Sequence, residues 1–354
     1  MGKVRRMFPG GNTSEGFYSF HDNIIDENRN MLYILKGMPG GGKSSLMKYI
    51  GQKAIEKDYD VEFHHCPSDP ESIDGVVIVQ LNIALVDGTF PHIIDPVYPG
   101  LIDKLVDLGK FIDEKKIKEH KDEIFEAKAN NRLAYRKAYA YFKGAKCIYD
   151  EIIEHNKNGV DFKRVNELTE GIIEEIYYGN SSWRPEDKFY PFTNRHLFSN
   201  ANTPDGFVDY TYTILEEVKN IYYIEGEIGT GKSTLINRIK EEGIVRGYKM
   251  EVYHNATIPK KIESLFIKEL NTYITSNKYG LKYPHKKIDL NQYFDKNIID
   301  EKDYNMYELL IKTGLFSLEK ARENHHILER CYRSSIDYHG VDRIKESLLE
   351  EILE

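Results

Sequence analysis

The chain has 354 residues, of which 40% are hydrophobic and 30% charged, and its formal net charge is −8. This length leaves room for two domains with cores of their own, and the acidic balance argues against a protein whose main task is to coat nucleic acid. Three cysteines without paired spacing, no leader and no bilayer-length apolar run predict a cytoplasmic protein, in a reducing compartment and without membrane contact.

The amino-terminal segment occurs twice. Residues 4–8 are a predicted strand that leads into a turn-rich segment at 9–16, and a near copy of both occupies residues 195–207. From residue 37 onward the copies run at a fixed offset of 189 positions, which pairs Glu62 with Glu251. Such self-similarity predicts two copies of one structural unit.

Each copy contains the pattern Gly-x4-Gly-Lys-Ser, at residues 37–44 and 226–233, between an apolar run and a helical one. This order predicts a strand, a phosphate-binding loop and a helix. Glycines let successive N–H groups face a phosphate chain, and the N-terminus of the following helix adds unpaired donors. The lysine supplies a positive charge to the phosphates, and the serine hydroxyl is a ligand for Mg²⁺. The residues expected to bind nucleotide are Gly37, Gly40, Gly41, Gly42, Lys43, Ser44 and Ser45 in the first copy and Gly226, Gly229, Thr230, Gly231, Lys232, Ser233 and Thr234 in the second.

The elements after each loop predict an α/β fold. Residues 45–57 are a predicted helix, and 60–65 and 82–86 are predicted strands, so we expect parallel sheets covered on both faces. Charged, helix-periodic sequence follows at 101–178 and again at 304–353. We therefore predict two phosphate-loop NTPase domains with mostly parallel sheets and helical extensions. The domains span residues 1–180 and 190–354, with a linker at 179–185.

Asp87 ends the third predicted strand of the first copy. A carboxylate at the tip of such a strand holds the Mg²⁺ shell, whereas an Asp-Gly pair also simply begins turns, and the loop upstream favours the metal role. We therefore expect Lys43 and Asp87 to be catalytic, and Ser44, Asp87 and Ser233 to hold Mg²⁺. The next residue is Gly88, where ATP-driven motors usually carry a glutamate that polarises water, which favours a kinase-like protein or slow hydrolysis.

The second copy departs from the first at the same place. The offset puts Ser276 opposite Asp87, and a neutral oxygen holds Mg²⁺ less firmly than a carboxylate. We expect the second loop to bind nucleotide as a structural or regulatory site, while the first loop carries the hydrolysis.

Histidines recur at matching positions. His65 and His254 end the second strands, where a ligand contact and a structural hydrogen-bonding role are both open and the structural role is favoured. His92 is echoed by His285, each after a proline. We do not expect zinc at residues 64–66, because neighbouring strand residues point to opposite faces.

Four arginines are candidates for contacting a phosphate. Arg132 and Arg136 share one face of the long predicted helix, where a solvated surface is favoured over a phosphate contact. Arg6 and Arg195, which we interpret as equivalent, are the alternatives.

The chain ends in a predicted helix, so the second copy lacks a strand after its extension. We predict that residues 4–8 pair with the sheet of the second copy, and 195–198 with that of the first.

Three features carry a family resemblance: the tandem loops, the Asn-Thr-x-x-Gly-Phe segments at 12–17 and 202–207, and the run from Val86 to His92. They resemble a family of bacterial double phosphate-loop proteins labelled as ATPases or nucleotide kinases. The resemblance covers nearly the whole chain and implies ATP binding through Lys43, Ser44 and the loop glycines.

The leading hypothesis is an ATP-binding, Mg²⁺-dependent NTPase that forms an intramolecular pseudo-dimer. Slow hydrolysis in the first domain would switch the helical extensions and act on a protein or small-molecule partner. A small-molecule or nucleotide kinase is the alternative, followed by a nucleic-acid-associated ATPase and a nucleotide-binding scaffold.

Overall fold

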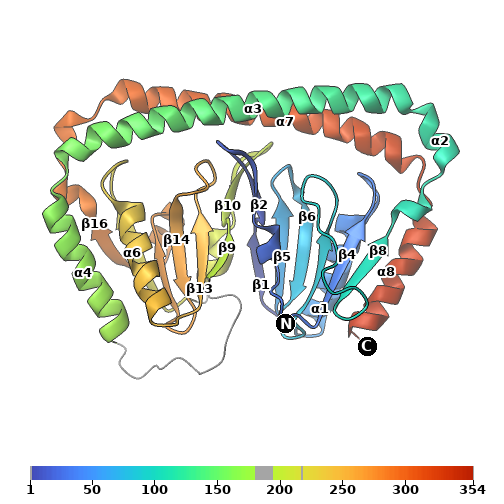
Figure 1. Ribbon diagram of the computed structural model, residues 1–354, viewed down its shortest axis with the longest axis horizontal. Coiled ribbons are helices and arrows are strands. Elements are labelled where there is room, and N and C mark those ends of the chain that lie inside the picture. The colour runs from blue at the N-terminus through green and yellow to red at the C-terminus, as the bar shows by residue number, and fades with distance from the viewer. Residues whose placement is uncertain (1, 180–193, 217, 354) are drawn as a thin grey trace.

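The structure is a computed structural model that describes residues 2–179, 194–216 and 218–353; apart from Gly179, the predicted linker at 179–185 lies outside this range. Two six-stranded sheets stand side by side beneath a pair of long antiparallel helices (Figure 1). Most strand pairs within the sheets are parallel. The prediction of an α/β protein with two mostly parallel sheets is confirmed.

The first sheet, in spatial order, consists of β1 (Val4–Met7), β5 (Val61–Cys66), β6 (Asp69–Ile78), β7 (Ile83–Asp87), β4 (Met31–Lys36) and β8 (Asp103–Asp107). The strands predicted at 4–8, 60–65 and 82–86 are present to within one residue. The antiparallel strand β6 was not predicted, and the expectation that residues 101–178 are helical throughout is wrong, because β8 adds an edge strand first. β8 has charged residues at both ends, so its sequence resembles the charged helices that follow.

The second sheet repeats this order with β9 (Asn194–Leu197), β13 (Met250–His254), β14 (Ile262–Ile267), β15 (Thr272–Thr275), β12 (Asn220–Glu225) and β16 (Lys286–Asp289). A hairpin follows the first strand of each repeat: β2 (Gly10–Thr13) with β3 (Gly16–Ser19), and β10 (Asn200–Thr203) with β11 (Gly206–Asp209). The two repeats therefore share one topology.

The first strand of each repeat pairs within its own sheet. β1 lies beside β5 with Arg5 opposite Glu62, and β9 lies beside β13 with Arg195 opposite Glu251. The predicted exchange of strands is wrong, because β8 and β16 complete the far edges and neither sheet needs a borrowed strand. The same register makes Arg5, rather than Arg6, the counterpart of Arg195.

The α-helices are α1 (Lys43–Glu56), α2 (Glu114–Glu119), α3 (Lys121–Asn156), α4 (Phe162–Tyr178), α5 (Thr211–Leu215), α6 (Lys232–Val245), α7 (Glu301–Arg333) and α8 (Tyr338–Leu353). Short 3-10 turns are η1 (His21–Asn23), η2 (Gly109–Phe111), η3 (Lys157–Gly159), η4 (Lys278–Lys282), η5 (Leu290–Tyr293) and η6 (Lys296–Ile298). None of the helices in the described part of the chain is both long and apolar enough to cross a bilayer.

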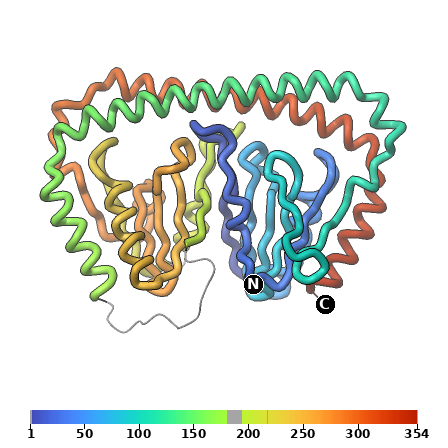
Figure 2. Tube along the Cα trace, viewed as in Figure 1, coloured from blue at the N-terminus to red at the C-terminus, as the bar shows by residue number. Residues whose placement is uncertain are grey.

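The helical extensions cross over between the repeats. α3 has 36 residues, or about 54 Å of helix, and carries the chain from the first sheet to the second, where α4 packs against α6 (Figures 1 and 2). Ile172 and Ile176 of α4 share a core with Leu235 and Ile239 of α6.

α7 returns in the opposite direction alongside α3. It delivers α8 to α1, where Leu348 and Ile352 join the core of the first sheet. Each hydrophobic core therefore contains one helix from the other repeat.

The repeats also meet directly between the sheets. Phe8 and Phe198 exchange two backbone hydrogen bonds, of 2.8 and 3.0 Å. The side-chain amides of Asn12 and Asn202 each donate to the other residue's carbonyl, at 3.0 and 3.2 Å. This reciprocity gives the molecule the pseudo-twofold arrangement expected of an internal dimer.

Candidate functional site

The first glycine-rich loop, residues 37–44, joins β4 to α1. Gly40 and Gly42 have φ angles of +69° and +86°, which side-chain-bearing residues rarely adopt. Gly42 is the N-cap of α1 and Lys43 its first residue. The loop therefore lies at the amino-terminal end of a helix, where unpaired N–H groups favour an anion.

Lys43 and Asp87 meet beside this loop. The ammonium of Lys43 donates to the carbonyls of Gly37 and Met38, at 2.8 and 3.0 Å, and lies 3.5 Å from Oδ2 of Asp87. The other oxygen of Asp87 accepts hydrogen bonds from the backbone and hydroxyl of Thr89, at 2.9 and 2.6 Å. The structure thus brings together a cation and a carboxylate that are 44 positions apart in the sequence.

The position after Asp87 has no space for a side chain. A Cβ built on Gly88 would lie 2.5 Å from Cγ2 of Ile34 and 2.9 Å from the carbonyl oxygen of Ile94. A glutamate at this position would therefore require the backbone to move.

Ser44 and Ser45 differ in accessibility. Ser44 is half-buried, and its hydroxyl accepts a 3.0 Å hydrogen bond from the backbone of Ile73 on β6. Ser45 is exposed on α1, as is its counterpart Thr234 on α6. Of these residues, Ser44 is the one that is partly buried, at the first turn of α1 next to Lys43.

The second glycine-rich loop, residues 226–233, repeats this geometry between β12 and α6. Gly229 and Gly231 have φ angles of +88° and +100°. Lys232 donates to the carbonyls of Gly226 and Glu227, the latter at 2.7 Å. The hydroxyl of Thr230 also donates to Glu227, at 2.8 Å, while Ser233 is half-buried at the first turn of the helix.

The surroundings of Lys232 differ from those of Lys43. Ser276 follows β15 at the position of Asp87, and its hydroxyl donates to the carbonyl of Glu263 at 3.3 Å. Burial, with a smaller contribution from Lys261, lowers the pKa of Lys232 to about 7. The second loop therefore has a lysine neighbour and lacks the strand-tip carboxylate of the first.

The exchanged helices cover the loops. The hydroxyl of Tyr338, at the start of α8, donates to the Gly40 carbonyl at 2.9 Å. A Cβ built on Gly40 would lie 3.0 Å from Cγ of Arg333, and one on Gly42 would lie 3.2 Å from Val341. The first loop is thus contacted by the helices of the second repeat.

The second loop is contacted in the same way by the first repeat. The amide of Asn156 donates to the carbonyl of Ile228 at 2.8 Å. A Cβ built on Gly229 would lie 3.1 Å from Cβ of Asn156, and one on Gly231 would lie 3.5 Å from Val165. Each candidate site is therefore composed of both repeats.

The arginines proposed from the sequence lie elsewhere. Arg132 and Arg136 are exposed on α3. Arg6 donates to Nε2 of His65 at 3.0 Å, and Arg195 bonds Glu62 at 2.7 Å. Arg333 of α7 lies against the first loop at Gly40. Nothing in the residues around Gly40 indicates this contact, because Arg333 lies 293 positions further along the chain.

The strand-end histidines have structural hydrogen bonds. Nδ1 of His65 donates to the Pro70 carbonyl at 2.8 Å, and Nδ1 of His254 donates to the Pro259 carbonyl at 2.5 Å. Burial lowers the pKa of His65 to about 4 and that of His254 to about 3. Both are therefore neutral near pH 7, in agreement with the favoured structural interpretation.

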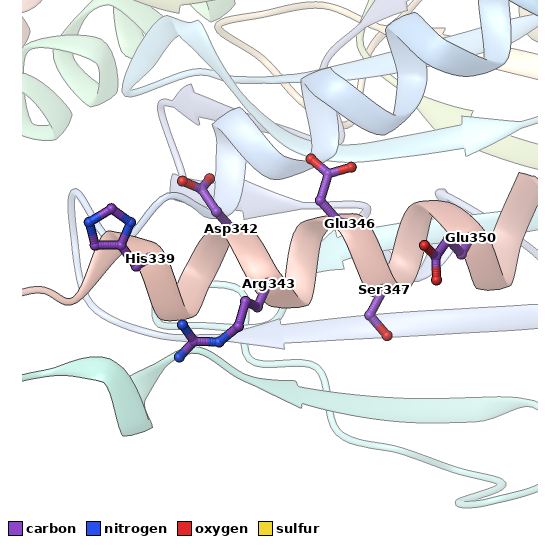
Figure 3. Close-up of a pocket in the computed structure, with 6 residues that line it drawn as sticks. All are labelled: His339, Asp342, Arg343, Glu346, Ser347 and Glu350. Carbon is purple, nitrogen blue, oxygen red and sulfur yellow. The ribbon is translucent and has the colours of Figure 1, made fainter.

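A depression along α8 is lined by none of the groups described above. Figure 3 shows that the six residues that line it all belong to one helix, from His339 to Glu350. Since α1, the sheets and the glycine-rich loops contribute nothing to its lining, it offers no converging groups for a substrate.

Comparison with protein-family models, with curated proteins and with solved structures finds no match to this chain. The functional argument therefore depends on the geometry of the two loops.

Proposed function

We propose that the first glycine-rich loop binds a nucleoside triphosphate, preferably ATP, with Mg²⁺. The observation that carries this proposal is the convergence of the Lys43 ammonium and the Asp87 carboxylate, 3.5 Å apart, beside two left-handed glycines at the start of α1. Lysine and helix-terminal N–H groups suit a triphosphate chain.

The oxygen donors available fit Mg²⁺, which prefers carboxylate and hydroxyl oxygens. Ser44 and Asp87 would hold the ion, and Mg²⁺ would neutralise charge that develops on the phosphates. Lys43 would then leave the Gly37 and Met38 carbonyls and contact the phosphate chain.

The proposed reaction is slow hydrolysis to nucleoside diphosphate and phosphate. Asp87 is followed by Gly88, whose surroundings exclude a glutamate side chain. Without that residue to polarise the attacking water, transition-state stabilisation would depend on Lys43, Mg²⁺ and the loop backbone.

The second loop would bind nucleotide without turning it over, because Ser276 replaces the carboxylate. Lys232 and the neighbouring Lys261 would favour the phosphates through charge. Its role would be structural or regulatory.

Exchange of the helices supports a switch between the repeats. Tyr338 and Arg333 of the second repeat contact the first loop, so a ligand that changes the position of Gly40 also acts on α7 and α8. Asn156 does the same for α3 at the second loop. A protein or small molecule bound to these helices would sense the nucleotide at either loop.

Three single variants test the proposal. With Mg·ATP, Lys43→Ala and Asp87→Asn should lower release of ADP by at least about 100-fold, whereas Lys232→Ala should retain measurable turnover. Circular dichroism and thermal unfolding should first establish that all three variants are folded. Full turnover by Lys43→Ala, or equal loss in Lys43→Ala and Lys232→Ala with nucleotide still bound at the intact loop, would overturn the assignment.

The same assay separates the alternatives. ADP release that requires an added nucleoside or other small molecule would identify a kinase, and release that rises with DNA would identify a nucleic-acid-associated ATPase. Binding without any release would identify a scaffold.

A further inference from the structure

A buried cluster of His21, Asp74 and His92 lies next to the first loop. The three residues come from η1, from β6 and from the segment after β7, and each is at least nine-tenths buried. Their potential ligand atoms all lie within 4.8 Å of one another. Asp74 follows Ile73, whose backbone bonds Ser44, so the cluster adjoins the proposed phosphate site without belonging to it.

Four polar atoms of this cluster have no hydrogen-bond partner among the described residues. These atoms are Nε2 of His21, Oδ2 of Asp74 and both ring nitrogens of His92. Nε2 of His21 lies 3.5 Å from Oδ2 of Asp74, and Nε2 of His92 lies 3.9 Å from Oδ1 of the same carboxylate. Both distances are too long for a strong hydrogen bond. Buried polar atoms without partners are destabilising, so a ligand that pairs with them would stabilise this part of the fold.

One ring is already oriented by a neighbour. Nδ1 of His21 lies 2.8 Å from the hydroxyl of Ser19. A hydrogen bond to the remote nitrogen is the usual way in which a ligating imidazole is fixed.

The second repeat provides an internal comparison. Its counterpart of Asp74 is Glu263, which accepts hydrogen bonds from the side chains of Asn200 and Asn255, at 2.5 and 3.1 Å. The counterpart of His21 is Thr211, bonded to Ser199 at 2.9 Å. Among the described residues, Glu263 and Thr211 thus have amide and hydroxyl partners, whereas the cluster of the first repeat leaves four atoms unpaired.

We propose that His21, Asp74 and His92 bind one divalent transition-metal ion of the Zn²⁺ or Fe²⁺ class. Two imidazoles and a carboxylate are a common donor set for such ions, and nitrogen ligands disfavour Mg²⁺. Two ligands about 2.1 Å from a tetrahedral ion are about 3.4 Å apart, close to the separations of 3.5 and 3.9 Å found here.

Binding has one geometric requirement. The two rings are stacked, with centroids 4.2 Å apart and planes 5° from parallel, so they must tilt until both ring planes contain the ion. The remaining coordination position would be open to water or to the thiol of Cys66, which adjoins Asp74. The ion would fix the segment after β7, and with it the position of Asp87.

Metal analysis of the full chain, without a histidine tag and without nucleotide, tests this inference independently of turnover. The wild-type protein should contain about one equivalent of zinc or iron. Asp74→Asn and His92→Gln should reduce this at least about tenfold. The matched control is His285→Gln, which removes the sequence echo of His92 in the second repeat and should leave the metal content unchanged.

Cobalt provides a readout that does not depend on the variants. Co²⁺ added to metal-free wild-type protein should produce visible absorption that saturates at one equivalent, and thiolate charge transfer would add Cys66 as a ligand. Absence of both native metal and cobalt absorption in the wild-type protein would overturn the proposal. So would a folded His92→Gln variant that binds cobalt as the wild-type protein does.

Discussion

The ion pairs between the repeats make a quantitative prediction. Glu251 is fully buried and contacts Arg5, while its Oε1 lies 3.2 Å from Arg195 and 2.9 Å from Lys268. Replacing Glu251 with glutamine removes one of the two buried carboxylates in this group. Glu62 would then be the remaining buried negative charge beside Arg5 and Arg195. Breaking a buried pair in this way costs about 3–5 kcal/mol, a large fraction of the stability of an ordinary domain.

Chemical denaturation of Glu251→Gln at pH 7 measures this loss. Asp150→Asn, which breaks the exposed Lys146 pair on α3, is the control and should cost less than about 0.5 kcal/mol. Burial alone would raise the pKa of Glu251, but the surrounding cations hold it well below the usual range. The stabilisation should therefore be complete above about pH 4.5, decline below that value, and be lost as the pH passes the lower pKa of Glu251 in the folded protein.

Two results would refute this reasoning. One is a loss of less than about 1 kcal/mol at pH 7, below the range for a broken buried pair. The other is a difference between variant and wild type that persists unchanged at acidic pH, where the wild-type carboxylate is protonated.

Two further predictions concern the second loop and the long helices. The pKa of Lys232 is about 7, so triphosphate binding to a Lys43→Ala protein should require proton uptake above pH 7, and its affinity should weaken by up to about tenfold per pH unit. Calorimetry in two buffers of different ionisation enthalpy measures the proton uptake. An affinity that does not change from pH 7 to 9 would contradict the prediction. Gly144→Ala should raise stability by about 0.5–1 kcal/mol, because the new Cβ meets Leu310 at an ordinary 3.6 Å. Gly314→Ala should lower stability, because its Cβ would lie 2.5 Å from Phe142. The midpoint temperature of thermal unfolding should therefore rise in Gly144→Ala and fall in Gly314→Ala.

The elements with strong local signals were predictable. The glycines that adopt positive φ and the strand ending at Asp87 follow from residue type and spacing, as does the substitution of Ser276 at the same place. β6 was missed because it follows β5 through a short turn where the sequence pattern suggested a parallel crossover. β8 was missed because an edge strand with charged ends resembles a surface helix.

Contacts between distant segments could not be derived from local patterns. Nothing near Gly40 indicates that Tyr338 and Arg333 will cover it, since this follows from the crossing of α3 and α7. The cluster of His21, Asp74 and His92 could not be predicted for the same reason. Its three residues lie on separate elements, and of the three only His92 has a matching histidine, His285, in the second repeat.

The crossing of the helices makes a last prediction about chain architecture. Separate polypeptides of residues 1–180 and 190–354 should each be unstable alone but form a 1:1 complex when mixed or co-expressed. The second polypeptide lacks α4, whose buried Val165, Ile172 and Ile176 contribute about 1.5–3 kcal/mol each. That sum, about 5–9 kcal/mol, is comparable to the whole stability of a domain.

Variants of the first polypeptide identify the contact responsible. Ile172→Asp should abolish the complex, because it places a charge in the shared core, whereas Leu133→Asp, at a half-exposed position on α3, should not. Size-exclusion chromatography with light scattering measures association, and circular dichroism measures folding. A cooperative thermal transition of residues 190–354 alone, close to that of the intact chain, would show that the second core does not need α4. The coupling of the two loops through exchanged helices would then lose its physical basis, since each repeat could move independently of the other.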